Sequence, residues 1–238
     1  MLLIALFGLS FLSEMFGNNL QRHSISSLSW SGYLVTSGFT SSQFEVVGIN
    51  ASWVVPQVNA SAADGYSSAW VGIGGQSDTT LIQVGTEHNS FNGEASYSVW
   101  YELLPSYPQT INVSIQPQDT IVASITLTDS ATDEWNIQIT DVTNGQTFTQ
   151  TVVYNSNRSS AEWILERPNV NGQISSLVDF RTVNFAGCYV NIGNSVAPIG
   201  KEGYSRIQMT NQQYTVLASV SDLGSDNESF TVTYARSS

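Results

Sequence analysis

The chain has 238 residues, of which 41% are hydrophobic and 11% are charged, and its formal net charge at pH 7 is −12. This hydrophobic fraction supports a folded core and excludes a disordered chain. The balance of 19 Asp and Glu against 7 Lys and Arg lacks the basic patch that phosphates need, so we expect no nucleic acid partner.

The scarcity of basic side chains also bears on the pH at which the protein works. With every carboxylate protonated, only the seven Lys and Arg and the two His would carry charge. Such a chain repels itself little in acid, which suits a protein that works there. An acidic extracellular protein without this specialisation fits the composition equally well.

The N-terminus begins with an apolar run, MLLIALFGLSFL, at residues 1–12. Its length is typical of a signal peptide and short for a membrane span. We therefore divide the chain into an apolar segment with a polar connector (1–28) and a folded domain (29–238). The protein is expected to be secreted, or tethered by this segment, with no other stable membrane span. Cys188 is the only cysteine, so no intrachain disulfide is possible.

Two segments alternate apolar and polar residues with the period of two that is typical of half-buried strands. They are 120–128 and 135–140, and Asn144 and Gly145 after them predict a hairpin turn. The side chains expected to point inward are Ile121, Ala123, Ile125, Leu127, Trp135, Ile137 and Ile139.

Shorter runs of the same kind recur along the rest of the chain, without a sustained helical stripe. Many short strands separated by Gly, Asn and Ser turns indicate an all-β, single-domain antiparallel sandwich. The other expected strands are 31–36, 44–49, 67–73, 80–86, 95–103, 160–166, 175–181, 184–191, 213–219 and 228–235.

Several common mechanisms lack the residues they require. His23 and His88 are the only histidines, and no G-x-S-x-G motif accompanies them, which disfavours a Ser-His-Asp triad. One Cys and two distant His do not make a zinc site, so we expect no metal and no cofactor. The glycine-rich run at 72–75 lacks a following Lys and predicts a strand with close backbone approach.

Polar residues inside apolar strands are the remaining candidates. Gln83 stands between Ile82 and Val84, and Glu102 follows an aromatic pair. Glu162 and Glu166 are separated by four positions, so strand alternation puts them on one face. Each could simply face water on a sheet surface. Together with Trp70 they could form a carboxylate and amide cluster in an aromatic cleft.

Five segments resemble the eqolisins, or glutamic peptidases, in order and approximate spacing: SWSGYLVTSGF, SSAWVGIGG, LIQVGTE, SVWYELLP and SAEWILERP. The resemblance spans 29 to about 236. It implies a concanavalin-like sandwich of two large antiparallel sheets. It also implies Gln83 and Glu166 as the catalytic pair.

The same resemblance implies further residues and a mechanism. Cleft positions correspond to Trp30, Trp70, Trp100 and Glu102. Glu166 would act as general base on a water and the Gln83 amide would stabilise the oxyanion. The implied protein is an acid-active, non-metal endopeptidase acting on polypeptides, expected to be a monomer.

The resemblance leaves two details of the site open. Glu162 is interpreted as a structural partner of Glu166, although it is the other candidate for the base. Gly74 stands where family members often have Asp, so support for the catalytic Gln can differ here.

Three other functional hypotheses fit the same residues. A secreted carbohydrate-binding sandwich would also line a sheet with tryptophans, with Gln83 and Glu166 as sugar-binding groups. A catalytically inactive relative would look much the same. A structural module tethered at the surface is the third.

Overall fold

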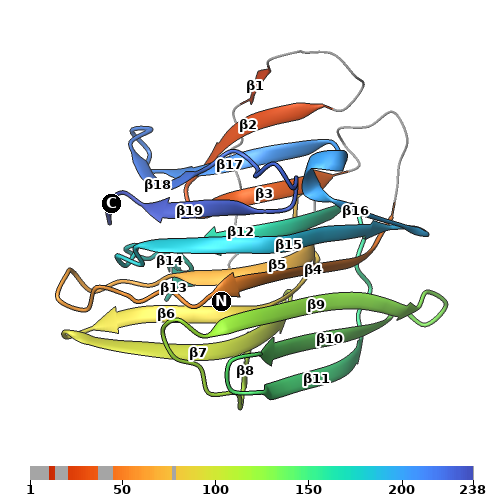
Figure 1. Ribbon diagram of the computed structural model, residues 1–238, viewed down its shortest axis with the longest axis horizontal. Helices are drawn as coiled ribbons and strands as arrows, with labels where there is room; N and C mark the ends of the chain where they lie inside the picture. Colours follow the sequence, from red (N-terminus) through yellow and green to blue (C-terminus); the bar gives the residue numbers. More distant parts are fainter. Residues whose placement is uncertain (1–10, 14–20, 37–44, 77–78, 238) are drawn as a thin grey trace.

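The computed structural model describes residues 11–13, 21–36, 45–76 and 79–237 (Figure 1). These residues form β-strands, the turns between them and one short 3₁₀ helix. The elements are β1 (Phe11–Ser13), β2 (Arg22–Ser27), β3 (Trp30–Thr36), β4 (Val46–Val54), β5 (Ser68–Gly74), β6 (Leu81–Phe91), β7 (Glu94–Leu103), β8 (Gln109–Ile111), β9 (Thr120–Asp129), β10 (Glu134–Asp141), β11 (Gln146–Val153), β12 (Ser160–Glu166), β13 (Asn169–Val170), β14 (Gln173–Ile174), β15 (Thr182–Ile192), β16 (Ser195–Pro198), η2 (Ile199–Lys201), β17 (Tyr204–Thr210), β18 (Val216–Val220) and β19 (Phe230–Tyr234).

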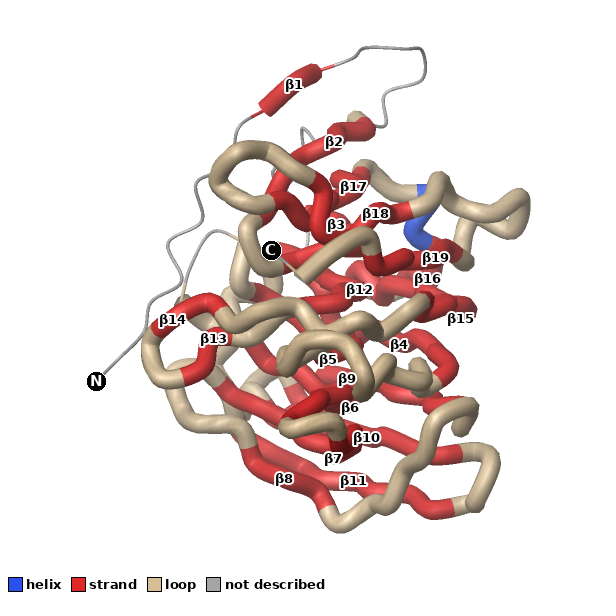
Figure 2. The backbone as a smooth tube through the Cα atoms, turned by 90° about the vertical axis from the view of Figure 1, so that its left-hand side faces the viewer, coloured by secondary structure: helices blue, strands red, loops and turns tan. Residues whose placement is uncertain are grey.

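Apart from β13 and β14, which pair only with each other, the described strands form two layers, as a sandwich requires. One layer has the order β1-β2-β17-β3-β12-β5-β6-β7-β8. The other has the order β11-β10-β9-β4-β15-β19-β18, with β16 beside β15. Hydrogen bonding continues between the layers at the β17–β18 pair, where the register shifts between Met209 and Thr210. Most strands run in similar directions across the molecule (Figures 1 and 2), as in aligned sheet packing.

The inner faces of the two layers form the main core. The expected inward residues of β9 and β10 are in it: Ile121, Ile125, Trp135 and Ile137 are fully buried, while Leu127 is half-buried. The Asn-Gly hairpin is confirmed, because β10 and β11 pair on either side of it. The all-β antiparallel sandwich predicted from these patterns is therefore correct.

The polar N-terminal connector is only partly a connector. Residues 22–27 form β2, which pairs in parallel with β17 over Tyr204–Met209. β17 was not expected either. β2 is mostly polar and β17 mixes polar with apolar residues, so pairing with neighbouring backbones rather than a clear apolar pattern makes them strands. Apart from the backbone of β1, residues 1–20 lie outside the part of the chain that can be described.

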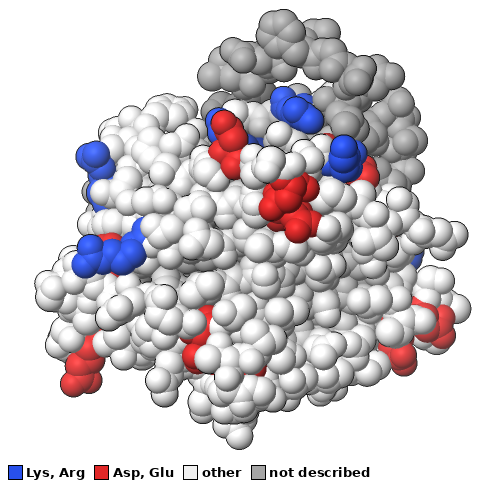
Figure 3. All heavy atoms as spheres, in the orientation of Figure 1, with Lys and Arg blue, Asp and Glu red and all other residues white. Residues whose placement is uncertain are grey.

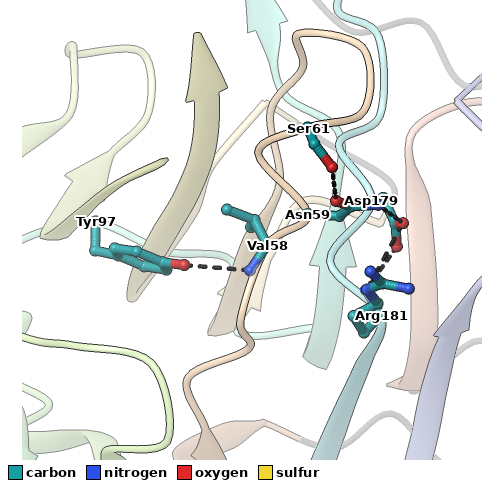
Figure 4. A network of polar contacts seen from close by, with 6 residues as sticks. All are labelled: Val58, Asn59, Ser61, Tyr97, Asp179 and Arg181. Atoms are coloured by element: carbon teal, nitrogen blue, oxygen red, sulfur yellow. Dashed lines mark hydrogen bonds and ion pairs between the residues drawn. The ribbon is translucent and has the colours of Figure 1, made fainter. Parts of the chain in front are cut away.

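The strand expected at 175–181 is absent, although its sequence alternates. Asp179 accepts a hydrogen bond from the Arg181 amide at 3.1 Å, and Arg181 has a left-handed φ of 63°, which interrupts the extended chain. Asp179 also accepts from the Asn59 side chain at 3.0 Å (Figure 4). Tyr97 holds the same loop through the Val58 amide at 3.2 Å. Residues 175–181 therefore form a loop, and Asp179 in it stabilises the β4–β5 loop through Asn59.

The surface carries few charges, and the face in Figure 3 is mostly uncharged. Ser, Thr, Asn and Gln supply its polarity, as the low charged fraction implies. Among the residues that the structure covers, no helix is long and apolar enough to cross a membrane. Cys188 is a free thiol, and it is buried.

Candidate active site

The layer that contains β3, β12, β5, β6 and β7 has a second apolar face, turned away from the main core. Strand alternation sends every other side chain there. We call it the tryptophan face, because Trp30, Trp70 and Trp100 are all buried on it. Its apolar cluster is separate from the main core and consists of Ile25, Trp30, Leu34, Trp70, Leu81, Trp100, Ile164 and Ile207, with Leu104 packed against it.

Gln83 and Glu166 belong to this face. Gln83 pairs with Gly72 on β5, and Glu166 pairs with Ser68 on the same strand. β5 therefore lies between β6 and β12, so Gln83 and Glu166 share a face but stand on strands that are separated by one strand. The reason is that β12 enters the sheet between β3 and β5, a long-range pairing that local patterns do not encode.

Glu166 is the last residue of β12, and indole groups surround its carboxyl. Trp70 Nε1 donates to Glu166 Oε2 at 2.8 Å. Trp30 and Trp70 meet edge to face, with ring centroids 5.1 Å apart. Burial raises the pKa of Glu166 to about 7; hydrogen bonds from Trp70 and Trp30 oppose this shift, and the charge of Glu102 adds to it. Near neutral pH this carboxyl can therefore both take and give a proton.

Gln83 is paired with Glu102 across β6 and β7. Gln83 Nε2 lies 2.6 Å from Glu102 Oε2, and Gln83 is only 5% exposed. Gln83 Oε1 is buried without a hydrogen-bond partner among the described residues. Burial also raises the pKa of Glu102, against the lowering effect of the Gln83 hydrogen bond. One carboxyl thus fixes the amide, and it is itself easier to protonate than a free Glu.

Gly72 provides space at the centre of this arrangement. A Cβ at Gly72 would stand 2.9 Å from Trp70 Cζ3 and 3.2 Å from Gln83 Cβ. Any side chain there would push the Trp70 ring or Gln83 aside. The strand predicted for the run at 72–75 is present through Gly74, but the atoms that crowd Gly72 belong to side chains and not to a neighbouring backbone. Nothing in the sequence indicated the link between Gly72 and the candidate pair.

Gly74 stands at a backbone position that favours glycine. It has a φ of +97°, and a Cβ there would come within 2.5 Å of the Thr80 carbonyl oxygen. An Asp would be strained at this position. Support for Gln83 therefore comes from Glu102 and not from position 74.

Glu162 is completely buried on the same face. It pairs with Leu34 on β3 and Gly72 on β5, in one row with Gln83. Glu166, in contrast, is partly exposed at the end of its strand. A general base must reach solvent and substrate, so burial favours Glu166 over Glu162 as the base.

Ser68 is a residue of the site that sequence reasoning missed. It lies beside Glu166 in the register. Trp100 Nε1 donates to Ser68 Oγ at 3.1 Å, and Ser68 Oγ donates to the Thr86 carbonyl at 3.0 Å. Ser68 therefore orients the third tryptophan. Serine is so common in this chain that no sequence signal distinguishes it.

His88 lies on the other side of the sheet. It is fully buried, its Nε2 is 2.8 Å from Thr86 Oγ1, and burial lowers its pKa to about 3. It belongs to the core between the layers and does not face Glu166. Within the described ranges, no group of three or more His, Cys, Asp and Glu could hold a metal ion.

A scan of protein families gives a match over residues 29–234 to the Peptidase A4 family. The chain belongs to this family. Peptidase A4 members are glutamic, non-metal acid peptidases, which agrees with a site built from Gln and Glu. Aspergillopepsin-2 of Aspergillus niger is 27% identical over 234 residues, covering 87% of this chain and 78% of that protein.

Solved structures of Peptidase A4 proteins share the fold. Scytalido-glutamic peptidase with a peptide-based transition state analogue has a TM-score of 0.69 at 22% identity and covers 87% of this chain and 98% of its own. Aspergilloglutamic peptidase from Aspergillus niger has a TM-score of 0.64 at 28% identity and covers 72% of this chain and 99% of its own. The predicted eqolisin resemblance and sandwich fold are thereby confirmed.

Proposed function

We propose that this protein is an acid-active endopeptidase in which Glu166 is the general base and Gln83 the oxyanion donor. The observation that carries the proposal is a carboxyl that accepts a hydrogen bond from the Trp70 indole N–H on the same sheet face as a buried glutamine, with one strand between them. Membership of the A4 family of glutamic peptidases supports a mechanism that depends on a glutamate. Polypeptides would be the substrates.

In the proposed hydrolysis Glu166 transfers one proton in two steps, first from water to itself and then to the leaving nitrogen. The Glu166 carboxylate takes a proton from a water, whose oxygen then bonds to the peptide carbonyl carbon. The carbonyl oxygen becomes negative and accepts a hydrogen bond from Gln83 Nε2. When the C–N bond breaks, Glu166 returns the proton to the leaving nitrogen. Trp70 keeps its hydrogen bond to the ionised carboxyl and so stabilises the base form.

We further propose that Glu102 must be protonated during this reaction. At 2.6 Å, its contact with the Gln83 amide is short for N–H···O and ordinary for O–H···O. A protonated Glu102 can donate to Gln83 Oε1, which requires the amide to be reversed. The reversed amide directs its N–H groups away from Glu102 and gives the buried carbonyl oxygen the partner it lacks.

This arrangement offers a physical reason for activity in acid. The reactive state carries one proton on the Glu102–Glu166 pair, with Glu102 protonated and Glu166 ionised. Because the pKa of Glu166 is raised to about 7, the same proton is held mainly by Glu166, and the reactive form is the minor one of the two. When both carboxyls are protonated the base is lost, and when both are ionised Gln83 faces the substrate with its oxygen. The plot of kcat/KM against pH should therefore be bell-shaped. Both of its limbs should report the coupled titration of Glu102 and Glu166.

Export is a second part of the proposal. The apolar run at 1–12 has the length of a signal peptide, and a sparsely charged, Ser- and Thr-rich surface suits an extracellular protein. We propose that the mature domain acts outside the cell as a monomer. Size-exclusion chromatography of protein from a culture medium would check both points.

The decisive experiment compares three variants of this protein, each assayed between pH 3 and 7 with a denatured protein as the substrate. Glu166→Gln and Gln83→Glu should each lower peptide hydrolysis by several orders of magnitude, because one removes the base and the other replaces the amide donor. Glu162→Gln should lower it far less. Circular dichroism of each variant checks the fold, and Glu94→Gln, on an exposed hairpin tip, is the matched control.

Two outcomes would reject the assignment. Near-normal hydrolysis by Glu166→Gln together with an inactive Glu162→Gln would make Glu162 the base. Absence of hydrolysis by the unmodified protein, with retained binding of a glycan array, would favour the carbohydrate-binding alternative.

A further inference from the structure

A hollow of about 310 Å³ opens at the end of β12, next to the candidate base. Four chain segments meet there: the residue after β2, the residue after β12, β14 and the β17–β18 turn. β14 and the β17–β18 pair lie on the same side of the molecule in Figure 1. The lining residues are Leu28, Arg167, Ile174, Asn211, Gln212 and Gln213.

Arg167 is the charged group of this hollow, and its side chain is unusually buried, with the residue only 8% exposed. Its Nε donates to the Leu28 carbonyl at 2.7 Å, and one terminal nitrogen donates to the Ser175 carbonyl at 3.4 Å. Both acceptors are neutral. A guanidinium has five N–H donors, so these two contacts leave part of its capacity unused.

No carboxylate offsets the charge of Arg167 within the ranges that the structure describes. Arg158, Arg181 and Arg206 each form an ion pair with an Asp or Glu, whereas Arg167 forms none. Burial lowers the pKa of Arg167, which reflects the cost of a desolvated cation. Burying an unpaired charge is expensive, and the planar fork of a guanidinium matches a carboxylate in particular.

Glu166 and the hollow lie at the same end of β12, because Glu166 is its last residue and Arg167 comes next; we infer that one substrate passing the end of this strand can reach both. Consecutive Cα atoms are about 3.8 Å apart, and Arg167 follows Glu166 directly. An extended peptide advances about 3.3 Å per residue. A residue within about three positions of the bond that faces Glu166 can therefore present its side chain to the hollow.

We propose that this hollow is a subsite for a carboxylate of the peptide substrate, recognised by Arg167. The inference rests on the proposed peptidase function and adds a substrate preference to it. The carboxylate could belong to an internal Asp or Glu side chain or to a free C-terminus. Arg stays charged throughout the acid range, and model carboxyls are largely ionised above about pH 4.5, so both sources are available at the pH of the assay.

The test uses the full chain and peptides that differ at one position. In the first arm an internal Glu or Gln is placed at each of four positions on either side of the cleaved bond. In the second arm the peptide ends in a free acid or an amide at the same distances. The quantity compared at pH 5 is the ratio of kcat/KM for the charged and the neutral member of each pair.

We expect the charged member to be preferred at least about 10-fold at one distance, the size of a hydrogen-bonded charge contact. Arg167→Gln should bring that ratio close to 1, and Arg167→Lys should keep an intermediate ratio. Arg236→Gln, at an exposed site, should keep the full ratio. A preference in the first arm alone identifies an acidic side chain, and one in the second arm alone identifies a C-terminus.

Equal rates for charged and neutral peptides at every distance would overturn the proposal. So would an Arg167→Gln variant that slows both members equally, since that would make Arg167 only a clamp on the Leu28 and Ser175 carbonyls. If Arg167→Gln does not fold, Arg167→Lys decides between these outcomes. Fluorescence-anisotropy binding of the same peptides to the unmodified protein and to Glu166→Gln separates the subsite from the mechanism. A charge preference in binding by both proteins, together with no cleavage by the unmodified protein, rejects only the peptidase mechanism.

Discussion

The unmodified protein should lose stability between pH 4 and pH 8, and replacement of Glu166 by Gln should remove most of that loss. Burial raises the pKa of Glu166 from 4.5 to about 7, so between these values the native state binds more protons than the unfolded chain. The stabilisation from this group is therefore present in acid and is lost as the pH rises through about 7. Gln has no proton to lose and removes this dependence.

The size of the effect follows from the pKa shift. One pKa unit corresponds to about 1.4 kcal/mol, so a shift of roughly 2.5 units gives about 3 kcal/mol, with some reduction because Glu166 is partly exposed. With a urea m-value of about 2–3 kcal/mol/M, the difference amounts to about 1 M in the unfolding midpoint.

The assay is urea unfolding at pH 4 and pH 8, followed by tryptophan fluorescence, with gels to detect self-digestion. The unmodified protein should lose about 3 kcal/mol more than Glu166→Gln between the two pH values. Glu94→Gln, at the exposed β6–β7 tip, should behave as the unmodified protein does. An identical pH dependence in Glu166→Gln and the unmodified protein would refute the raised pKa of Glu166.

Two further predictions concern the titratable neighbours. Glu102→Gln offers Gln83 a permanent N–H donor and removes the charge that raises the pKa of Glu166, so the bell of kcat/KM against pH should widen on both sides; an unchanged alkaline limb would rule out a protonated Glu102. Burial lowers the pKa of His88 to about 3, so this residue binds fewer protons in the folded protein than in the unfolded chain. Its contribution to the free energy of unfolding is therefore lost as the pH falls from about 6.5 to 3, and the loss is at most about 5 kcal/mol. His88→Gln should flatten this part of the stability curve, and thermal unfolding at pH 6 and pH 3 would show it; equal slopes for the two proteins would count against a neutral buried His88.

The sequence by itself determined the class of the fold and the inventory of candidate residues. Period-two alternation predicts β-strands because side chains of a strand point alternately to two faces. Positions such as Trp135 and Ile137 are buried for that reason. The same patterns isolated Gln83, Glu102 and Glu166 as polar residues in apolar strands, and the family resemblance gave them roles.

Only the tertiary structure decided how these residues are arranged. β12 enters between β3 and β5, and such pairing depends on partners distant in sequence, so the separation of Gln83 and Glu166 by a strand was not predictable. β2 and β17 became strands through hydrogen bonds to neighbours, without an apolar pattern. The pKa values of Glu166 and Glu102 depend on desolvation by segments far away in the chain, as does the burial of Arg167 without a carboxylate. Local sequence specifies which side chain is present, whereas its solvation and its partners are set by the packing of the whole sandwich.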